Sequence, residues 1–412
     1  MNRKNLFNNQ SKDGIIFTTV GGGGCIDVEN TATFLDESSK EIKYTSCEYI
    51  NGYGIIKFNG KLRRTSGMMF RSGTALLTVT FPNGFISLGR YALEYQRALT
   101  TVTLPNSCVS IDLGAFYYCT ALTNITIPNK ISYIPIDCFR DCSSLNKIVI
   151  PDSVIEIDQY AFADCRKLSN CTLSNSLVKI NDYAFYNCSL GNISLPKTLK
   201  QIGYCAFAYA GLGEIIVPEN VTSIGAGAFH GNNFGLTSNI QFRASDSDYW
   251  MRQYFEKDYA FDGCKKLVDI VWPNDVTKIP YRAFANCTSL DSTEIPDTVT
   301  SIGEQAFQEC TSLSSITLSS NVSDIGEQAF LYCNSLTNIT LPSSVTHIGT
   351  QAFRDCSKLS KITILAATPP VLGSYVFDDI SSNATIYVPS SSVYAYRTAD
   401  EWSAYDTKIQ AI

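Results

Sequence analysis

The stretch IPDTVTSIGEQAFQECTSLSSITLSSNV, residues 295–322, decides the fold, because close copies of it recur along the chain. Its phenylalanine, Phe307, belongs to a series with steps of 22 to 24 residues and one longer step of 32 residues. The series contains Phe116, Phe139, Phe162, Phe185, Phe207, Phe229, Phe261, Phe284, Phe307, Phe330, Phe353 and Phe377, and Leu93 lies one period earlier. A fixed period in this range indicates a solenoid, whose coils bury their apolar sides against one another.

The residues of one copy predict how a single coil is built. Val299, Ile302 and Phe307 are expected to point inward, and 316–318 alternates in, out, in, as a half-exposed strand does. Stacked coils bring such strands side by side at roughly 4.8 Å in a parallel sheet. We therefore predict a repeat solenoid of about 13 coils of 22–23 residues with one parallel sheet face.

Nine of the fifteen cysteines sit three residues after a repeat phenylalanine. Other coils place Ala210 or Asn232 at this position, which indicates a small, tight site. A free cysteine packs there as a small hydrophobe, so we predict a reduced core ladder rather than a disulfide framework. A zinc site is not expected, because no CxxC pair occurs and there are two histidines. The structural core ladder is represented by Phe116, Phe162, Phe284, Phe307, Cys165, Cys287, Cys310 and Cys333.

Composition limits the possible function. The 412 residues carry a net charge of -6 with interspersed charges, which argues against a nucleic-acid partner. No apolar run approaches the ~18 residues of a transmembrane helix. The start, MNRKNLFNNQSKDGII, has two basic residues without a following apolar region, so no secretory signal is expected.

The repeat pattern I-P-x-x-V-x-x-I-x-x-x-A-F-x-x-C-x-x-L-x-x-I-x-L-P resembles the BspA-type (Treponema pallidum-type) leucine-rich repeat over about residues 79–378. The resemblance implies a leucine-rich repeat solenoid and a non-catalytic surface protein. Such proteins include bacterial adhesins that bind matrix proteins or other cells, and relatives in protozoa and phages of gut bacteria. The stretch EIKYTSCEYINGYGIIKFNGKL, residues 41–62, looks like the lead-in strand pair of repeat proteins from gut phages and prophages.

Three regions follow from this pattern. Residues 1–65 form a non-repeat anchor or cap region, and residues 66–378 form the solenoid, with an irregular insertion at about 243–258. Residues 379–412 resemble the closing segment of such proteins, with a strand, a helix after Ser390 and Trp402 as a lid over the open core. A terminal cap is needed because the last coil otherwise exposes apolar surface.

Two sets of residues are candidates for binding a macromolecular partner. The first is the outward position of the sheet strands, a hydroxyl-bearing face suited to a protein or glycan, although strand propensity alone also explains it. Its members are Thr103, Thr126, Thr172, Thr317, Thr340 and Thr363. The second is an aromatic cluster in the insertion, which serves either as an interface anchor or as a plug for the irregular core. Its members are Tyr249, Trp250, Arg252, Tyr254 and Phe255.

Catalytic and cofactor sites find no support in the sequence. His230 and His347 lie in different coils, and no nucleophile elbow or metal-ligand spacing occurs, so we predict neither an enzyme nor a cofactor. The run of glycines at 21–24 lacks the Gly-Lys-Ser/Thr of a phosphate loop. The N-terminal region is instead expected to be a turn or a docking segment for a larger assembly, and Cys25 and Cys47 could pair.

These inferences predict a non-catalytic recognition or adhesion protein, located outside the cell or on a cell surface. Two alternatives remain open. One is a tail or fibre component of a phage particle, docked through the N-terminal region. The other is an intracellular scaffold, since the chain could stay in the cytoplasm without classical export.

Overall fold

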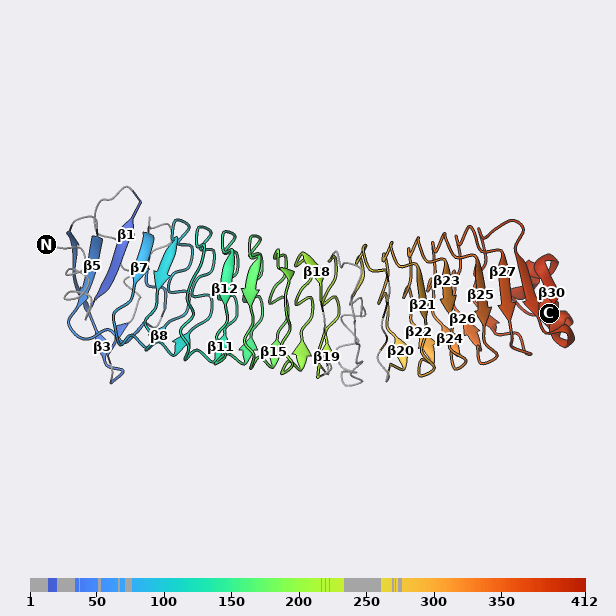
Figure 1. Ribbon diagram of the computed structural model, residues 1–412, viewed down its shortest axis with the longest axis horizontal. Helices are drawn as coiled ribbons and strands as arrows, with labels where there is room; N and C mark the ends of the chain where they lie inside the picture. The colour runs from blue at the N-terminus through green and yellow to red at the C-terminus, as the bar shows by residue number, and fades with distance from the viewer. Residues whose placement is uncertain are drawn as a thin grey trace. The chain divides into compact units, whose positions relative to one another are not determined.

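The computed structural model describes residues 14–20, 34–36, 38–50, 53–65, 67–70, 76–215, 217–218, 220–221, 223–232, 261–268, 270, 272 and 276–412. The chain divides into two compact units, Met1–Gly211 and Leu212–Ile412. Each unit is a stack of β-coils with little helix, in agreement with the repeat solenoid that the sequence predicts (Figure 1). The predicted region boundaries at 65 and 378 are not tested by this division and stay predictions.

The first unit begins with antiparallel strands that lead into the parallel stack. β4 (Tyr44–Ile50) and β5 (Tyr53–Phe58) pair antiparallel, which confirms the expected lead-in strand pair. β1 (Ile15–Thr19) pairs antiparallel with both β5 and β7 (Leu76–Thr80). In this sheet, parallel pairing starts where β7 pairs with β9 (Thr101–Thr103). The first sheet has the order β4 (Tyr44–Ile50), β5 (Tyr53–Phe58), β1 (Ile15–Thr19), β7 (Leu76–Thr80), β9 (Thr101–Thr103). The second has the order β10 (Ser110–Ile111), β8 (Ser87–Leu88), β6 (Arg64–Thr65), β2 (Phe34–Leu35), β3 (Glu41–Ile42).

The later coils of the first unit repeat one pattern. A typical coil contributes a two-residue strand before its phenylalanine, and most coils contribute a second strand after it. The two-residue strands form a sheet of their own, in addition to the expected sheet. Neighbouring strands pair in parallel one repeat apart, as Lys147 does with Asn170. The short strands are β11 (Tyr133–Ile134), β13 (Glu156–Ile157), β15 (Lys179–Ile180) and β17 (Gln201–Ile202). The strands that follow the phenylalanines are β12 (Lys147–Val149), β14 (Asn170–Thr172) and β16 (Gly191–Asn192).

The second unit repeats the same coil and ends in a cap. Its short strands are β19 (Ser223–Ile224), β20 (Lys278–Ile279), β22 (Ser301–Ile302), β24 (Asp324–Ile325), β26 (His347–Ile348) and β28 (Val371–Leu372). Its other strands are β18 (Leu212–Glu214), β21 (Ser292–Glu294), β23 (Ser315–Thr317), β25 (Asn338–Leu341), β27 (Lys361–Ile364), β29 (Thr385–Val388) and β30 (Ile409–Ala411). The cap also contains η1 (Ser390–Ser392), α2 (Val393–Thr398) and η2 (Trp402–Lys408).

Trp402 closes the apolar core at the C-terminal end, as the sequence predicts. Its side chain is buried, its ring centroid lies 6.0 Å from that of Phe377, and its indole N–H donates to the Pro370 carbonyl at 2.8 Å. Tyr396 lies edge-on against Trp402, and its hydroxyl donates to the Ala366 carbonyl. The cap therefore covers the last coil without leaving these polar atoms unpaired.

The repeat phenylalanines form a stack of rings in each unit. In the first unit, from Phe116 to Phe207, successive ring centroids are 5.0–5.3 Å apart and the rings are within 8° of parallel. In the second unit, from Phe229 to Phe377, the spacing is 5.1–5.8 Å. The stacking distance is close to the spacing of paired strands, so ring packing and strand pairing reinforce one another.

The ladder cysteines lie beside the ring stack and are free thiols. Each thiol donates to the carbonyl of the core residue one coil earlier, as in Cys119 to Leu93 at 3.0 Å, Cys142 to Phe116 at 3.2 Å and Cys165 to Phe139 at 3.1 Å. Burial raises the pKa of Cys119 to about 12. Cys47 differs from these cysteines because it is disulfide-bonded, and Cys25 lies outside the described residues.

Replacing one ring of the stack is expected to weaken the protein strongly. Phe307→Ala removes contacts with both neighbouring rings and should lower the free energy of unfolding by about 3–5 kcal/mol. The matched change Ser315→Ala, at an exposed strand position, should change it by less than about 0.5 kcal/mol. Chemical denaturation measures both, and a loss below about 1 kcal/mol for Phe307→Ala would contradict a packed stack.

The buried thiols should resist alkylation in the folded protein. The pKa of Cys119 in the folded state lies above the ~8.5 of an unfolded cysteine, so its neutral form is favoured by folding. The contribution of Cys119 to the free energy of unfolding is therefore complete below pH ~8.5 and declines as the pH rises towards the folded-state pKa. Iodoacetamide treatment at mildly alkaline pH, read by mass spectrometry for each cysteine, should modify ladder cysteines only after denaturation. Rapid labelling of Cys119 in the native protein would refute this.

Candidate functional site: a tyrosine-rich turn face in the first unit

The turn around each repeat phenylalanine holds two positions of the same unusual backbone conformation. The residues two before and two after the phenylalanine have positive φ, for example Asp137 (54°) and Asp141 (58°) around Phe139. Adjacent turns are joined by backbone hydrogen bonds, as between the Asp141 amide and the Ala163 carbonyl at 2.9 Å. The turns of successive coils thus form a third, rigid face beside the two sheets.

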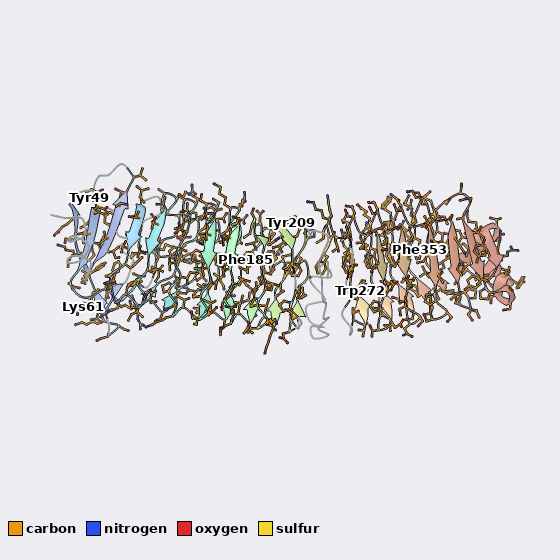
Figure 2. The ribbon with its side chains drawn as sticks, in the orientation of Figure 1. Tyr49, Lys61, Phe185, Tyr209, Trp272 and Phe353 are labelled. Carbon is orange, nitrogen blue, oxygen red and sulfur yellow. The ribbon has the colours of Figure 1, made fainter. Side chains whose placement is uncertain are left out.

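In the first unit this turn face collects nine tyrosines from the coils of Leu93 to Phe207. We call these residues the tyrosine face. They are Tyr91, Tyr95, Tyr117, Tyr118, Tyr160, Tyr183, Tyr186, Tyr204 and Tyr209. Figure 2 labels Tyr209 towards the margin of the coils, whereas Phe185 lies among them. Tyr209 is 47% exposed and the others are partly exposed.

Many of these tyrosines occupy a conformation that suits other residues better. Tyr118, Tyr160 and Tyr183 have φ values of 59°, 55° and 57°. A bulky side chain at positive φ costs roughly 1–2 kcal/mol, whereas glycine, asparagine and aspartate adopt this region more readily. Equivalent positions in other coils hold Gly114 and Gly231. The turn therefore requires positive φ, and it does not require tyrosine.

The tyrosine rings contact one another in two clusters. In the first, Tyr95 stacks on Tyr118 with centroids 5.0 Å apart, and Tyr117 meets both rings edge-on at 5.6 and 4.9 Å. In the second, Tyr160 stacks on Tyr183 at 4.8 Å with an interplanar angle of 6°. Three edge-on ring contacts extend the second cluster: Tyr183–Tyr186, Tyr183–Tyr204 and Tyr186–Tyr209. Such ring contacts contribute about 0.5–1.5 kcal/mol each, which offsets much of the backbone cost.

Arg140 joins the two tyrosine clusters. Its guanidinium carbon lies 4.8 Å from the ring centroid of Tyr160 and 5.8 Å from that of Tyr117. Its Nη1 donates to Asp137 Oδ1 at 3.1 Å, which holds the guanidinium between the rings. This geometry is that of a cation–π contact supported by an ion pair. These contacts therefore link Arg140 and eight of the nine tyrosines, all but Tyr91, into one surface.

Carboxylates lie in the same surface between the two clusters. Asp164 accepts hydrogen bonds from Asn187 Nδ2 at 2.7 Å and from Arg166 Nη2 at 3.0 Å. Asp141, one coil earlier, has Arg140 Nε 3.9 Å away, beyond hydrogen-bond distance. Burial, followed by the negative charge of Asp164, raises the pKa of Asp141. The site thus holds a carboxylate whose charge is only partly compensated.

The tyrosine hydroxyls of this surface are hydrogen-bonding groups. Burial raises the pKa of Tyr117 to about 12, so its hydroxyl is neutral and can both donate and accept hydrogen bonds.

Among the described residues, no group of three or more His, Cys, Asp or Glu side chains is arranged to hold a metal ion. In the part of the chain that the structure describes, no helix has the length and apolar character needed to cross a bilayer.

The sheet-face threonines predicted from the sequence point outward but do not form one continuous surface. Five are exposed and Thr363 is half-buried. Thr340 pairs directly with Thr363, whereas the neighbours of Thr172 and Thr317 in the sheet are Val149 and Glu294. Three lie in the first unit, Thr103, Thr126 and Thr172, and three in the second, Thr317, Thr340 and Thr363. Their binding role stays a prediction.

The two remaining sets of predicted residues are the aromatic cluster of the insertion and the core ladder. The aromatic cluster of the insertion, Tyr249, Trp250, Arg252, Tyr254 and Phe255, lies outside the described residues. The predicted core ladder is 0% exposed, so it cannot contact a partner directly. It contains Phe116, Phe162, Phe284, Phe307, Cys165, Cys287, Cys310 and Cys333.

The tyrosine face was not predicted from the sequence. The signal was present, because its tyrosines stand three or two residues before the repeat core residue, or one or two residues after it. These offsets look irregular along the chain, and only the turn geometry brings them together. A column-by-column comparison of the coils at those four offsets would have found them.

The chain belongs to the family described as the BspA type leucine rich repeat region, whose model matches residues 40–166, 133–247 and 257–395. This confirms the resemblance read from the repeat pattern. A comparison with curated proteins returns no match.

One solved structure shows the same fold, and a second is less similar. A leucine-rich repeat protein from Bacteroides ovatus is 22% identical with a TM-score of 0.64, and the match covers 94% of this chain and 99% of that one. A leucine rich cell surface protein from Faecalibacterium prausnitzii is 23% identical with a TM-score of 0.49, covering 92% and 98% of the two chains. At these identities the likeness concerns the fold alone.

A double-mutant cycle tests the contact that joins the two clusters. The cycle combines Arg140→Met with Tyr160→Leu and should give a coupling energy of about 0.5–1 kcal/mol in unfolding free energy, the range of a partly exposed cation–π contact. The control cycle pairs Tyr160→Leu with Lys130→Met, an exposed residue of the same unit, and should give no coupling. Equal coupling in both cycles would contradict the described geometry.

Proposed function

We propose that the protein is a non-catalytic recognition protein that binds a macromolecular partner through the tyrosine face of its first unit. One observation carries the proposal. Tyrosines gather in five of the six coils from Leu93 to Phe207, at turn positions where the backbone gains nothing from tyrosine. The second unit supports this reading, because three consecutive turns use the same backbone with glutamine two residues before phenylalanine, at Gln305, Gln328 and Gln351.

Membership of a leucine-rich repeat family favours the same conclusion. Stacked coils give long, shallow surfaces, which suit macromolecular partners better than small substrates. Tyrosine and arginine are enriched among the residues that dominate interface energies. The paired turns also hold the tyrosines in place before binding, which reduces the entropy lost on association.

The test compares two sets of tyrosines that share one backbone conformation. The tyrosine-face variant carries Tyr118→Asn, Tyr183→Asn and Tyr209→Asn, because asparagine suits positive φ. The control variant carries Tyr332→Asn and Tyr375→Asn, which are exposed turn tyrosines of the second unit with φ values of 62° and 60°. Fluorescently labelled proteins are titrated onto whole cells and onto protein and glycan arrays.

The tyrosine-face variant should lose at least about tenfold in affinity for the captured partner, the scale of removing one interface hot spot. The control variant should bind like the unchanged protein, and both should keep its melting temperature. Equal binding by all three folded proteins would refute a role for the tyrosine face.

We further propose that the protein acts at a surface, either of a cell or of a phage particle docked through residues 1–65. Proteomics of purified virions, cell envelopes and cytosol separates these locations. Recovery from the cytosol alone would favour the intracellular scaffold and contradict both surface locations.

A further inference from the structure

The arrangement of the rings limits what the tyrosine face can bind. A sugar ring stacks on the open face of an aromatic ring. In the two stacked pairs, Tyr95–Tyr118 and Tyr160–Tyr183, one face of each ring is covered by the other tyrosine. Arg140 also lies over the rings of Tyr117 and Tyr160. These contacts reduce the ring area on which a pyranose could stack, and an amphipathic surface of rings and hydroxyls suits polypeptide backbone and polar side chains.

Charge on this face differs from charge in the rest of the unit. The nine-residue windows centred on the core residues of these six coils hold seven carboxylates, four arginines and no lysine, a local net charge of -3. Residues 1–211 as a whole hold 20 Lys+Arg against 16 Asp+Glu, a net charge of +4. Negative charge is thus concentrated where the tyrosines are, and most basic residues lie elsewhere.

The arginines of this face do not neutralise it fully. Arg140 is committed to Asp137 and to the tyrosine rings, and Arg166 to Asp164. The Nε of Arg140 makes no hydrogen bond, and its ion pair with Asp141 is long, at 3.9 Å. The pKa of Asp141 is raised, first by burial and then by the negative charge of Asp164 one coil away. A cationic group of a partner would relieve this repulsion.

We infer that the tyrosine face recognises a polypeptide segment bearing lysine or arginine side chains. This inference rests on the proposed function and names the class of its partner. The hydroxyls and edges of the tyrosines contact the segment, while the carboxylates around Asp141 and Asp164 pair with its cations. Charge complementarity of this kind gives specificity and speeds association.

A peptide-display library tests the inference with a defined probe. Random peptides are selected on the full-length protein and counter-selected on the variant Tyr118→Asn, Tyr183→Asn, Tyr209→Asn, which removes peptides held only by general acidity. This step matters because residues 212–412 carry 12 Lys+Arg against 22 Asp+Glu. The selected peptides are expected to be enriched in lysine and arginine, and a glycan array is probed in parallel.

Charge-matched variants then locate the contact. Asp141→Asn with Asp164→Asn should weaken the selected peptides at least about tenfold, the scale reported for close interfacial charge pairs. The control, Glu309→Gln with Asp355→Asn, removes two carboxylates from equivalent positive-φ positions of the second unit, where φ is 59° and 60°. It should change peptide affinity by less than about twofold, as distant and independent sites do.

Two results overturn the inference and differ from failure of the proposed function. Tyrosine-dependent peptides without basic enrichment, or unaffected by Asp141→Asn with Asp164→Asn, would refute a cationic partner while leaving recognition by the tyrosine face intact. Tyrosine-dependent binding of array glycans instead of peptides would refute the polypeptide class. If neither peptides nor glycans depend on the tyrosines, both this inference and the proposed site fail.

Discussion

The stacked phenylalanine rings are the constraint on which the rest of each unit depends. A ring must enter every coil at the same depth, so the chain turns sharply on both sides of it and adopts positive φ two residues before and two after. The amide and carbonyl groups of these turns then pair from coil to coil at strand spacing. Ring packing, strand pairing and the ladder of cysteine thiols thus repeat with one period.

This constraint fixes the backbone of the turn face and leaves its side chains free. In the second unit, glutamines fill the column of positions two residues before successive phenylalanines. Their side-chain amides hydrogen-bond to one another, since Gln328 Nε2 donates to Gln351 Oε1 at 2.7 Å. The first unit fills the same column partly with tyrosine, whose contacts are ring against ring. Both solutions stabilise the turns by side-chain ladders, yet only tyrosine adds a large amphipathic area at the surface. The difference between the units is therefore chemical rather than architectural.

Periodicity explains how much could be predicted from the sequence. The coil length and the buried cysteines follow from spacing and composition, whereas the closing role of Trp402 follows from the resemblance of the C-terminal segment to that of the family, and the structure agrees with all three. The two-residue strands were not predicted, because two residues such as Glu156 and Ile157 give no alternating pattern to detect. The tyrosine face was missed for a different reason. Tyrosine does not signal positive φ, so residues such as Tyr160 gave no indication that they share one face.

The separation of core from surface makes the tyrosine face informative about function. In this fold each coil satisfies its core with phenylalanine, cysteine and leucine, and positive φ is met at the least cost by glycine or asparagine. The ring contacts of Tyr160 and Tyr183 recover roughly what their backbone conformation costs, so stability alone gives little reason to prefer them. What tyrosine adds, and glycine does not, is a rigid hydroxyl-bearing surface placed beside partly compensated carboxylates. That addition is what supports the proposed role of the tyrosine face in recognition.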